Sequence, residues 1–263
     1  MTQILSATKQ GLVFEIISAR ISEQPAEKKH VIYTLQVRYI SGSDDLTPSV
    51  IDRRYTQFEN LYNGLRRDFP DFMADTQFPK KVLTGNFNNE LISARSTAFE
   101  SVLRHVGSES KIRTSKSMQI FLQEPELTEA KQLFEKQSCN ILAFEKFQNV
   151  FKLLNKVFSD RSHAVLLTLC WIVACCEEYP KLAHAVRWSD LALYRFDGVS
   201  DTDLLQLYLP LLHACEKIYE ENEKSTESIL LQLDNMRRQG INDKGGKSLF
   251  EALNELEERI LKQ

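Results

Sequence analysis

The sequence predicts an α+β domain, in which a three-stranded antiparallel meander packs on a small helical subdomain, followed by an all-α domain of stacked helical hairpins. Two observations predict the fold class. Between residues 12 and 53, apolar and polar residues alternate with the period of two that half-buried strands show. From residue 127 onward, glycine and proline are sparse and apolar residues recur at helical spacing. Pro125 marks the boundary, so we expect domains at residues 1–126 and 127–263.

The meander is predicted from three apolar segments separated by turn-forming residues. The predicted strands are Leu12–Ala19, Val31–Ile40 and Ser49–Arg53. Pro25 and several charges predict a loop at residues 21–29, and Gly42 with two aspartates predicts a turn at residues 42–45.

Helical periodicity begins directly after the third strand. Apolar residues predict a helix over Thr56–Phe69, which Pro70 ends. Residues 71–89 have no helical period and include Pro79, and a loop of this length in a compact domain is usually functional. A second helix is predicted over Glu90–Val106, and a short third helix, capped by a hydroxyl side chain at residue 114 or 115, ends near Leu122.

The second half predicts helices joined by short turns. They are expected at residues 128–137, 141–157, 163–178, 181–195, 202–221, 226–239 and 247–261. Pro210 is expected to kink the fifth of them. Stacked helical hairpins are one interpretation of this pattern, and a plain helical bundle is the other.

Composition and charge restrict the function. With 43% hydrophobic and 26% charged residues among 263, the chain has the composition of a soluble globular protein. Residues 1–126 carry 16 basic and 15 acidic side chains, and residues 127–263 carry 17 and 21, so we expect no nucleic-acid partner. The start lacks a signal-peptide pattern, and the longest apolar run, residues 164–176, is too short for a membrane span. We therefore expect a cytoplasmic protein with peripheral membrane contact at most.

The five cysteines do not form a recognisable site. Their odd number and the absence of an export signal predict reduced thiols. Cys175 and Cys176 with His184 lack a second ligand pair at metal-site spacing, so no metal and no cofactor is expected. An enzyme using Cys/His chemistry in the helical half is an alternative, but no nucleophile or phosphate-loop motif accompanies these residues, and we expect no enzyme.

The stretch Arg53-Arg54-Tyr55 lies where the third strand passes into the first helix. The amides of a helix N-terminus attract anions, and a guanidinium adds two parallel hydrogen bonds that match phosphate oxygens. Tyr55 offers a rigid ring on which a cyclic ligand can pack. Because neighbouring side chains of an extended segment point to opposite sides, Arg53 should face away from Arg54 and play a structural part.

Four segments in order resemble the phox-homology (PX) domain over about residues 10 to 124. The stretch starting at Arg53 resembles its phosphate-binding signature, and residues 78–82 resemble its proline-containing loop. Residues 90–95 resemble the start of its second helix, and residues 117–122 its closing helix. In place of the two prolines that the family loop often carries, this chain has Pro79 alone.

The resemblance implies a site for phosphatidylinositol 3-phosphate. Arg54 would hold the 3-phosphate, Tyr55 would pack under the inositol ring, Lys81 would contact the 1-phosphate and Arg95 would bind the 4- and 5-hydroxyls. Val82 and Leu83 would insert into the bilayer.

A PX domain followed by helices resembles the sorting nexins with a PX-associated B domain, in the branch of sorting nexins 20 and 21. Proline and glycine divide the second half too finely for the long helices of a BAR domain. The resemblance implies a tetratricopeptide-like module that binds protein, and a peripheral adaptor on the cytosolic face of early endosomes. A PX-type scaffold that binds protein with little lipid specificity is the alternative.

Overall fold

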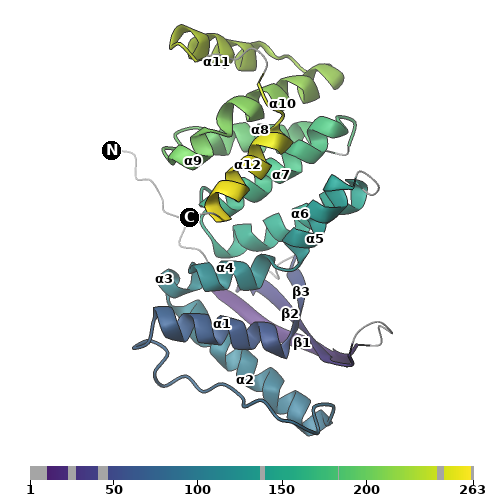
Figure 1. Cartoon of the computed structure of the whole chain (residues 1–263), viewed down its shortest axis with the longest axis vertical. Coiled ribbons are helices and arrows are strands. Elements are labelled where there is room, and N and C mark those ends of the chain that lie inside the picture. The colour runs from purple at the N-terminus through teal and green to yellow at the C-terminus, as the bar shows by residue number, and fades with distance from the viewer. Residues whose placement is uncertain are drawn as a thin grey trace. The chain divides into compact units, whose positions relative to one another are not determined.

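The chain forms two compact units, Met1–Glu124 and Pro125–Gln263, each with its own apolar core. The computed structural model describes residues 11–22, 28–40, 47–136, 140–182, 184–241 and 246–261. The predicted fold class is confirmed, because a three-stranded antiparallel sheet with helices is followed by a helical remainder (Figure 1). The predicted turn at residues 42–45 and Cys139 lie outside the described residues.

The sheet of the first unit has the order β1-β2-β3. The strands are β1 (Leu12–Ile21), β2 (Val31–Tyr39) and β3 (Ser49–Arg54), and both pairs are antiparallel. The alternation in β2 puts Tyr33, Leu35 and Val37 on one fully buried face. The sequence pattern therefore set the register of the sheet, since a slip by one residue would expose this apolar set.

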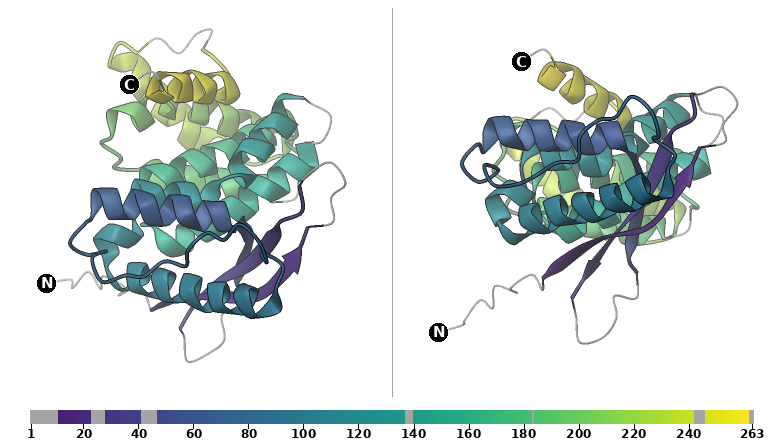
Figure 2. Two further views of the ribbon diagram at one scale, coloured as in Figure 1. Left: turned by 60° about the horizontal axis from the view of Figure 1, so that its bottom comes forward. Right: turned by 90° about the horizontal axis from the view of Figure 1, so that it is seen from below.

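Four helices follow the sheet: α1 (Tyr55–Asp68), α2 (Asn89–Ser108), α3 (Ser110–Arg113) and α4 (Lys116–Gln123). Figure 2 shows α1 and α2 beside the sheet. Their contact with it is aromatic: Phe58 of α1 stacks on Phe99 of α2 with ring centroids 4.0 Å apart, and Tyr33 meets both rings edge-on. These three side chains pack α1 and α2 against β2 and so hold both helices on the sheet.

Arg53 is completely buried, with 0% exposure. It pairs with Tyr33 across β2 and β3, so its side chain lies on the core face of the sheet. Its Nε donates to the carbonyl of Phe121 at 2.7 Å, and Nη2 donates to that of Leu122 at 3.0 Å. These carbonyls belong to the last turn of α4, where the helix leaves acceptors unsatisfied. The prediction that Arg53 is structural and faces away from Arg54 is confirmed.

The second unit is built around α7 (His163–Glu178). The remaining helices are α5 (Glu126–Glu135), α6 (Asn140–Val157), α8 (Ala185–Phe196), α9 (Thr202–Leu205), α10 (Tyr208–Glu221), α11 (Glu227–Arg238) and α12 (Leu249–Leu261). Successive helices pack in order from α5 to α8, as expected for stacked hairpins, and α10 and α12 also pack on α7. Twelve of the 16 residues of α7 are buried, which explains the apolar run at residues 164–176.

Two predictions about helices are corrected. The helix expected over residues 202–221 divides into α9 and α10, and Pro210 lies in the first turn of α10 instead of kinking a longer helix. A proline is tolerated there because a first-turn amide has no partner within the helix.

Within the described part of the chain, no helix combines the length and apolar character needed to cross a bilayer.

The described cysteines are buried in the core of the helical unit. Cys170, Cys175 and Cys176 on α7 and Cys215 on α10 are each 0% exposed. Burial raises the pKa of Cys176 and of Cys215 to about 12, and it also raises the pKa of Cys170 and Cys175. Because the thiolate is the reactive form, burial keeps these four side chains in the less reactive thiol form near neutral pH.

Arg53→Ala should strongly destabilise the fold. The change removes a hydrogen bond to the carbonyl of Asp52 and the two to α4, and it leaves two carbonyls of α4 without this charged donor, so we expect a loss of about 2–4 kcal/mol in the free energy of unfolding. Arg54→Ala is the matched control and should change stability by less than about 0.5 kcal/mol, because its side chain is exposed. Urea denaturation followed by circular dichroism measures both, and equal losses would contradict the structural difference between the neighbours.

A Cys139→Ser variant retains only the four buried thiols. In its native state, a chromogenic disulfide reagent at about pH 8 should react with none of these thiols. All four should react in concentrated urea. Fast reaction of a native thiol would mean that one of these side chains is accessible and ionised.

Candidate functional site

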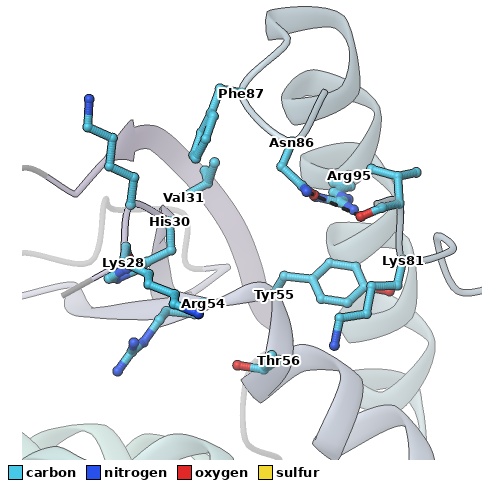
Figure 3. A pocket seen from close by; sticks show the side chains of 12 residues that line it. Lys28, His30, Val31, Arg54, Tyr55, Thr56, Lys81, Asn86, Phe87 and Arg95 are labelled. Atoms are coloured by element: carbon cyan, nitrogen blue, oxygen red, sulfur yellow. Dashed lines mark hydrogen bonds between the residues drawn. The ribbon is translucent and has the colours of Figure 1, made fainter. Parts of the chain in front are cut away.

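The first unit contains a cavity of about 460 Å³ beside the transition from β3 to α1. It is lined by Lys28, Lys29, His30, Val31, Arg54, Tyr55, Thr56, Lys81, Val82, Asn86, Phe87 and Arg95. All four predicted headgroup residues therefore border one space, although they come from β3, α1, the loop after Pro79 and α2. In Figure 3, Lys28 and Arg54 lie at one side of this space and Lys81 and Arg95 at the other, where the ring of Tyr55 lies next to them.

Arg54 caps the N-terminus of α1 from an extended backbone conformation. Its amide donates to Oε1 of Gln57 at 2.8 Å, so the helix start is closed by the main chain and by Gln57. Because Arg53 is turned into the core, the guanidinium of Arg54 is carried outward to the cavity. A cation here adds to the positive end of the helix dipole, which makes the position suited to an anion.

Tyr55 joins the cavity to the proline loop. Its hydroxyl donates to the carbonyl of Pro79 at 2.7 Å, and its ring lies 4.4 Å from Cζ of Arg95. The same side chain thus fixes the loop that carries Lys81 and covers a guanidinium face. Burial raises the pKa of the Tyr55 hydroxyl, which keeps it protonated as a donor.

Arg95 lines the cavity as a nearly buried cation, with 3% exposure. Nη1 donates to Oδ1 of Asn86 at 3.1 Å and Nη2 lies 3.5 Å from the carbonyl of Lys80, while Nε has no partner among the described residues. No carboxylate in the described part of the chain forms an ion pair with it. A buried charge with spare donors is costly, so polar oxygens of a ligand would stabilise it.

Lys81 lies at the mouth of the cavity, with its side chain 66% exposed. Its Nζ is 3.9 Å from Oε2 of Glu59 on α1, an exposed ion pair of the kind that contributes at most about 1 kcal/mol. A phosphate could therefore replace Glu59 as its partner at small cost.

The loop after Lys81 presents apolar side chains beside the cavity. Leu83 is 100% exposed and Phe87 is 43% exposed, whereas Val82 is half-buried and lines the cavity wall. The two residues predicted for membrane insertion thus differ: Leu83 is free to enter an apolar phase, and Val82 is partly held by the fold.

Several lining residues were not identified from the sequence, among them Lys28, His30 and Asn86. Lys28 and His30 lie just before β2, and the pairing of β2 with β3 brings them to the cavity. The basic run at residues 28–30 was the sequence feature that could have indicated them. Asn86 orients Arg95 and donates to the carbonyl of Val82 at 3.2 Å. Nothing in the sequence marked Asn86, because its role depends on the path of the loop.

Comparisons with known proteins agree with this architecture. A family model described as the PX domain matches residues 42–125. Human sorting nexin-21 is 34% identical over 209 residues, which cover 78% of this chain and 54% of that protein. Rat sorting nexin-20 is 31% identical over 223 residues, which cover 85% of this chain and 69% of that protein. The chain spans about half the length of the sorting nexin-21 relatives that it matches.

Among solved structures, the crystal structure of the mouse SNX19 PX domain with bound sulphate ion is 22% identical. The match covers 41% of this chain and 92% of that one, with a TM-score of 0.34. The sequence relationship extends well beyond the matched PX model, into the helical unit. The chain therefore belongs to the sorting nexin family, as a PX-domain member related to sorting nexins 20 and 21.

Proposed function

We propose that this protein is a peripheral membrane adaptor that binds phosphatidylinositol 3-phosphate on the cytosolic face of early endosomes and recruits protein partners for trafficking. Residues 1–126 would bind the lipid and residues 127–263 would bind protein. The observation that carries the proposal is that Arg54, Tyr55, Lys81 and Arg95 line one cavity, next to a loop with an exposed leucine.

The placement of the cations fits one phosphorylated inositol ring. Arg54 lies at one side of the space and Lys81 lies at the other, near the ring of Tyr55, so they could hold the 3-phosphate and the 1-phosphate of a headgroup lying against that ring. Arg95 is fixed by Asn86 and retains unused donors, which suit the 4- and 5-hydroxyls. An arginine that faces these two hydroxyls would leave little room for a phosphate at either position.

The exposed loop supplies the second component of membrane binding. Leu83 can bury its side chain among lipid tails while Lys80 and Lys81, exposed on the same loop, face the anionic surface. A headgroup contact and an apolar contact together explain why a small cavity could hold a whole protein on a membrane. The family relationship to sorting nexins supports the trafficking part of the proposal.

Arg54→Ala should weaken binding to liposomes containing phosphatidylinositol 3-phosphate by roughly tenfold to a thousandfold, because a charge-assisted bidentate contact worth about 2–4 kcal/mol is lost. Flotation across a panel of phosphoinositides measures the effect and the preference together. Arg66→Ala is the matched control, since Arg66 is an exposed arginine in the last turn of the same helix. If both folded variants bind like wild type, the cavity does not hold the 3-phosphate; if wild type binds no phosphoinositide, the protein-only scaffold is favoured.

Leu83→Asp should weaken binding to the same liposomes by at least about tenfold and leave the affinity for a soluble inositol 1,3-bisphosphate headgroup unchanged, because only a bilayer offers an apolar phase. Leu231→Asp provides the control, as Leu231 is a 60% exposed leucine on α11 in the other unit. Equal losses for liposome and headgroup would show that the aspartate disturbed the cavity and not a membrane contact.

A further inference from the structure

The helical unit contains a second cavity, of about 610 Å³, between α6 and α8. Lys152 on α6 lies at one wall, and Arg187, Trp188 and Tyr194 on α8 lie at the other. None of these residues was singled out as functional by the sequence, and the lipid site does not involve them. The cavity brings together two exposed cations and accessible aromatic rings.

Some cations of the unit are paired with carboxylates, whereas the two exposed cations of this cavity are not. Lys131 forms an ion pair with Glu257, and Lys146 forms one with Glu129. Lys152 and Arg187 make no ion pair or side-chain hydrogen bond among the described residues, although residues 127–263 carry 21 acidic side chains against 17 basic ones. Two like charges in one cavity of an otherwise acidic unit repel each other, so an anionic group between them would be stabilised.

The one carboxylate that lines the cavity is already occupied. Asp190 accepts a hydrogen bond from the hydroxyl of Tyr219 and forms an ion pair with Lys224, whose Nζ lies 2.5 Å from its Oδ1. Its charge is therefore directed toward α10 and the residues after it, and it is poorly placed to neutralise Lys152 and Arg187. The cavity as a whole presents positive charge to a ligand.

The aromatic side chains offer an apolar anchor point next to these charges. Trp188 is held edge-on against the buried ring of Phe151, with centroids 5.3 Å apart and an interplanar angle of 90°. Tyr194 is 72% exposed on the same helix. A rigid, partly exposed tryptophan and an accessible tyrosine are the residue types that dominate binding energy at protein interfaces.

We propose that this cavity binds an acidic peptide segment of a partner protein, with one aromatic or branched aliphatic side chain packed on Trp188 and Tyr194 and flanking carboxylates paired with Lys152 and Arg187. The proposal rests on the protein-recruiting role assigned above to residues 127–263. An anionic membrane or a nucleic acid fits less well, because an extended negative surface would also meet the acidic side chains that outnumber the basic ones in this unit.

The test uses the full chain and a fluorescein-labelled peptide in which one phenylalanine is flanked by glutamates and aspartates. Fluorescence anisotropy should show saturable binding that weakens by at least about tenfold when the phenylalanine becomes alanine or when Lys152→Glu and Arg187→Glu are combined. The same double variant should bind a peptide with lysines in place of the acidic residues better than wild type does. Lys181→Glu, at an exposed lysine outside the lining, is the charge-matched control and should keep wild-type affinity.

Tryptophan emission locates the bound peptide. The chain has two tryptophans, and Trp171 is 1% exposed, so an unlabelled peptide in the cavity should change the emission of Trp188 alone. The change should disappear in Trp188→Phe, which keeps an aromatic ring at this position.

Three results would overturn the proposal: no binding of the acidic peptide, equal binding by the double charge variant, or binding that is lost in Arg54→Ala, which would place the peptide in the lipid cavity. Liposome flotation of the double variant separates this proposal from the proposed function. Retained flotation shows that the lipid site is intact, whereas failure of wild type to float would contradict the lipid proposal without affecting the peptide result.

Discussion

The buried guanidinium of Arg53 is the interaction on which the first unit depends. It satisfies the carbonyls of Phe121 and Leu122 at the end of α4, and so ties the last helix of the unit to the last strand of its sheet. Because the backbone is extended at this point, turning Arg53 inward turns Arg54 outward. The structural arginine and the cavity arginine are thus two consequences of one strand geometry, and a shift in register would exchange them.

In the helical unit, the corresponding constraint is the burial of α7. This helix is apolar on nearly all sides, so it requires neighbours around it, and α6, α8, α10 and α12 supply them. Glu257 of α12 accepts from Nε1 of Trp171 at 3.1 Å and pairs with Lys131, which fixes α12 against the central helix. With the interior committed to packing, chemistry is left to the faces between outer helices, such as that between α6 and α8.

Both cavities share a physical feature: positive charge that the fold does not neutralise. Arg95 is nearly buried and bonded to neutral groups, and Lys152 and Arg187 face a cavity whose carboxylate is occupied elsewhere. The cost applies to Arg95, because a buried charge without a carboxylate partner reduces stability, whereas Lys152 and Arg187 are exposed to solvent. The two cavities differ in what lies beside the charge, an exposed leucine on a loop in one and aromatic rings on a rigid helix in the other.

The sequence by itself determined the three strands, the sheet register, most of the helices and four of the residues that line the cavity of the first unit. Period-two alternation in β2 and helical spacing after Tyr55 are local patterns that burial enforces, and the motif from Arg53 to Arg95 placed four cavity residues correctly in one space. Tertiary structure alone decided the partners of those residues. Asn86 bonds to Arg95 and Glu59 pairs with Lys81, and Lys152 and Arg187 line one cavity from two different helices. Such arrangements produce no periodic pattern in the sequence, because they depend on how a loop or a neighbouring helix is placed and not on the local preference of the backbone.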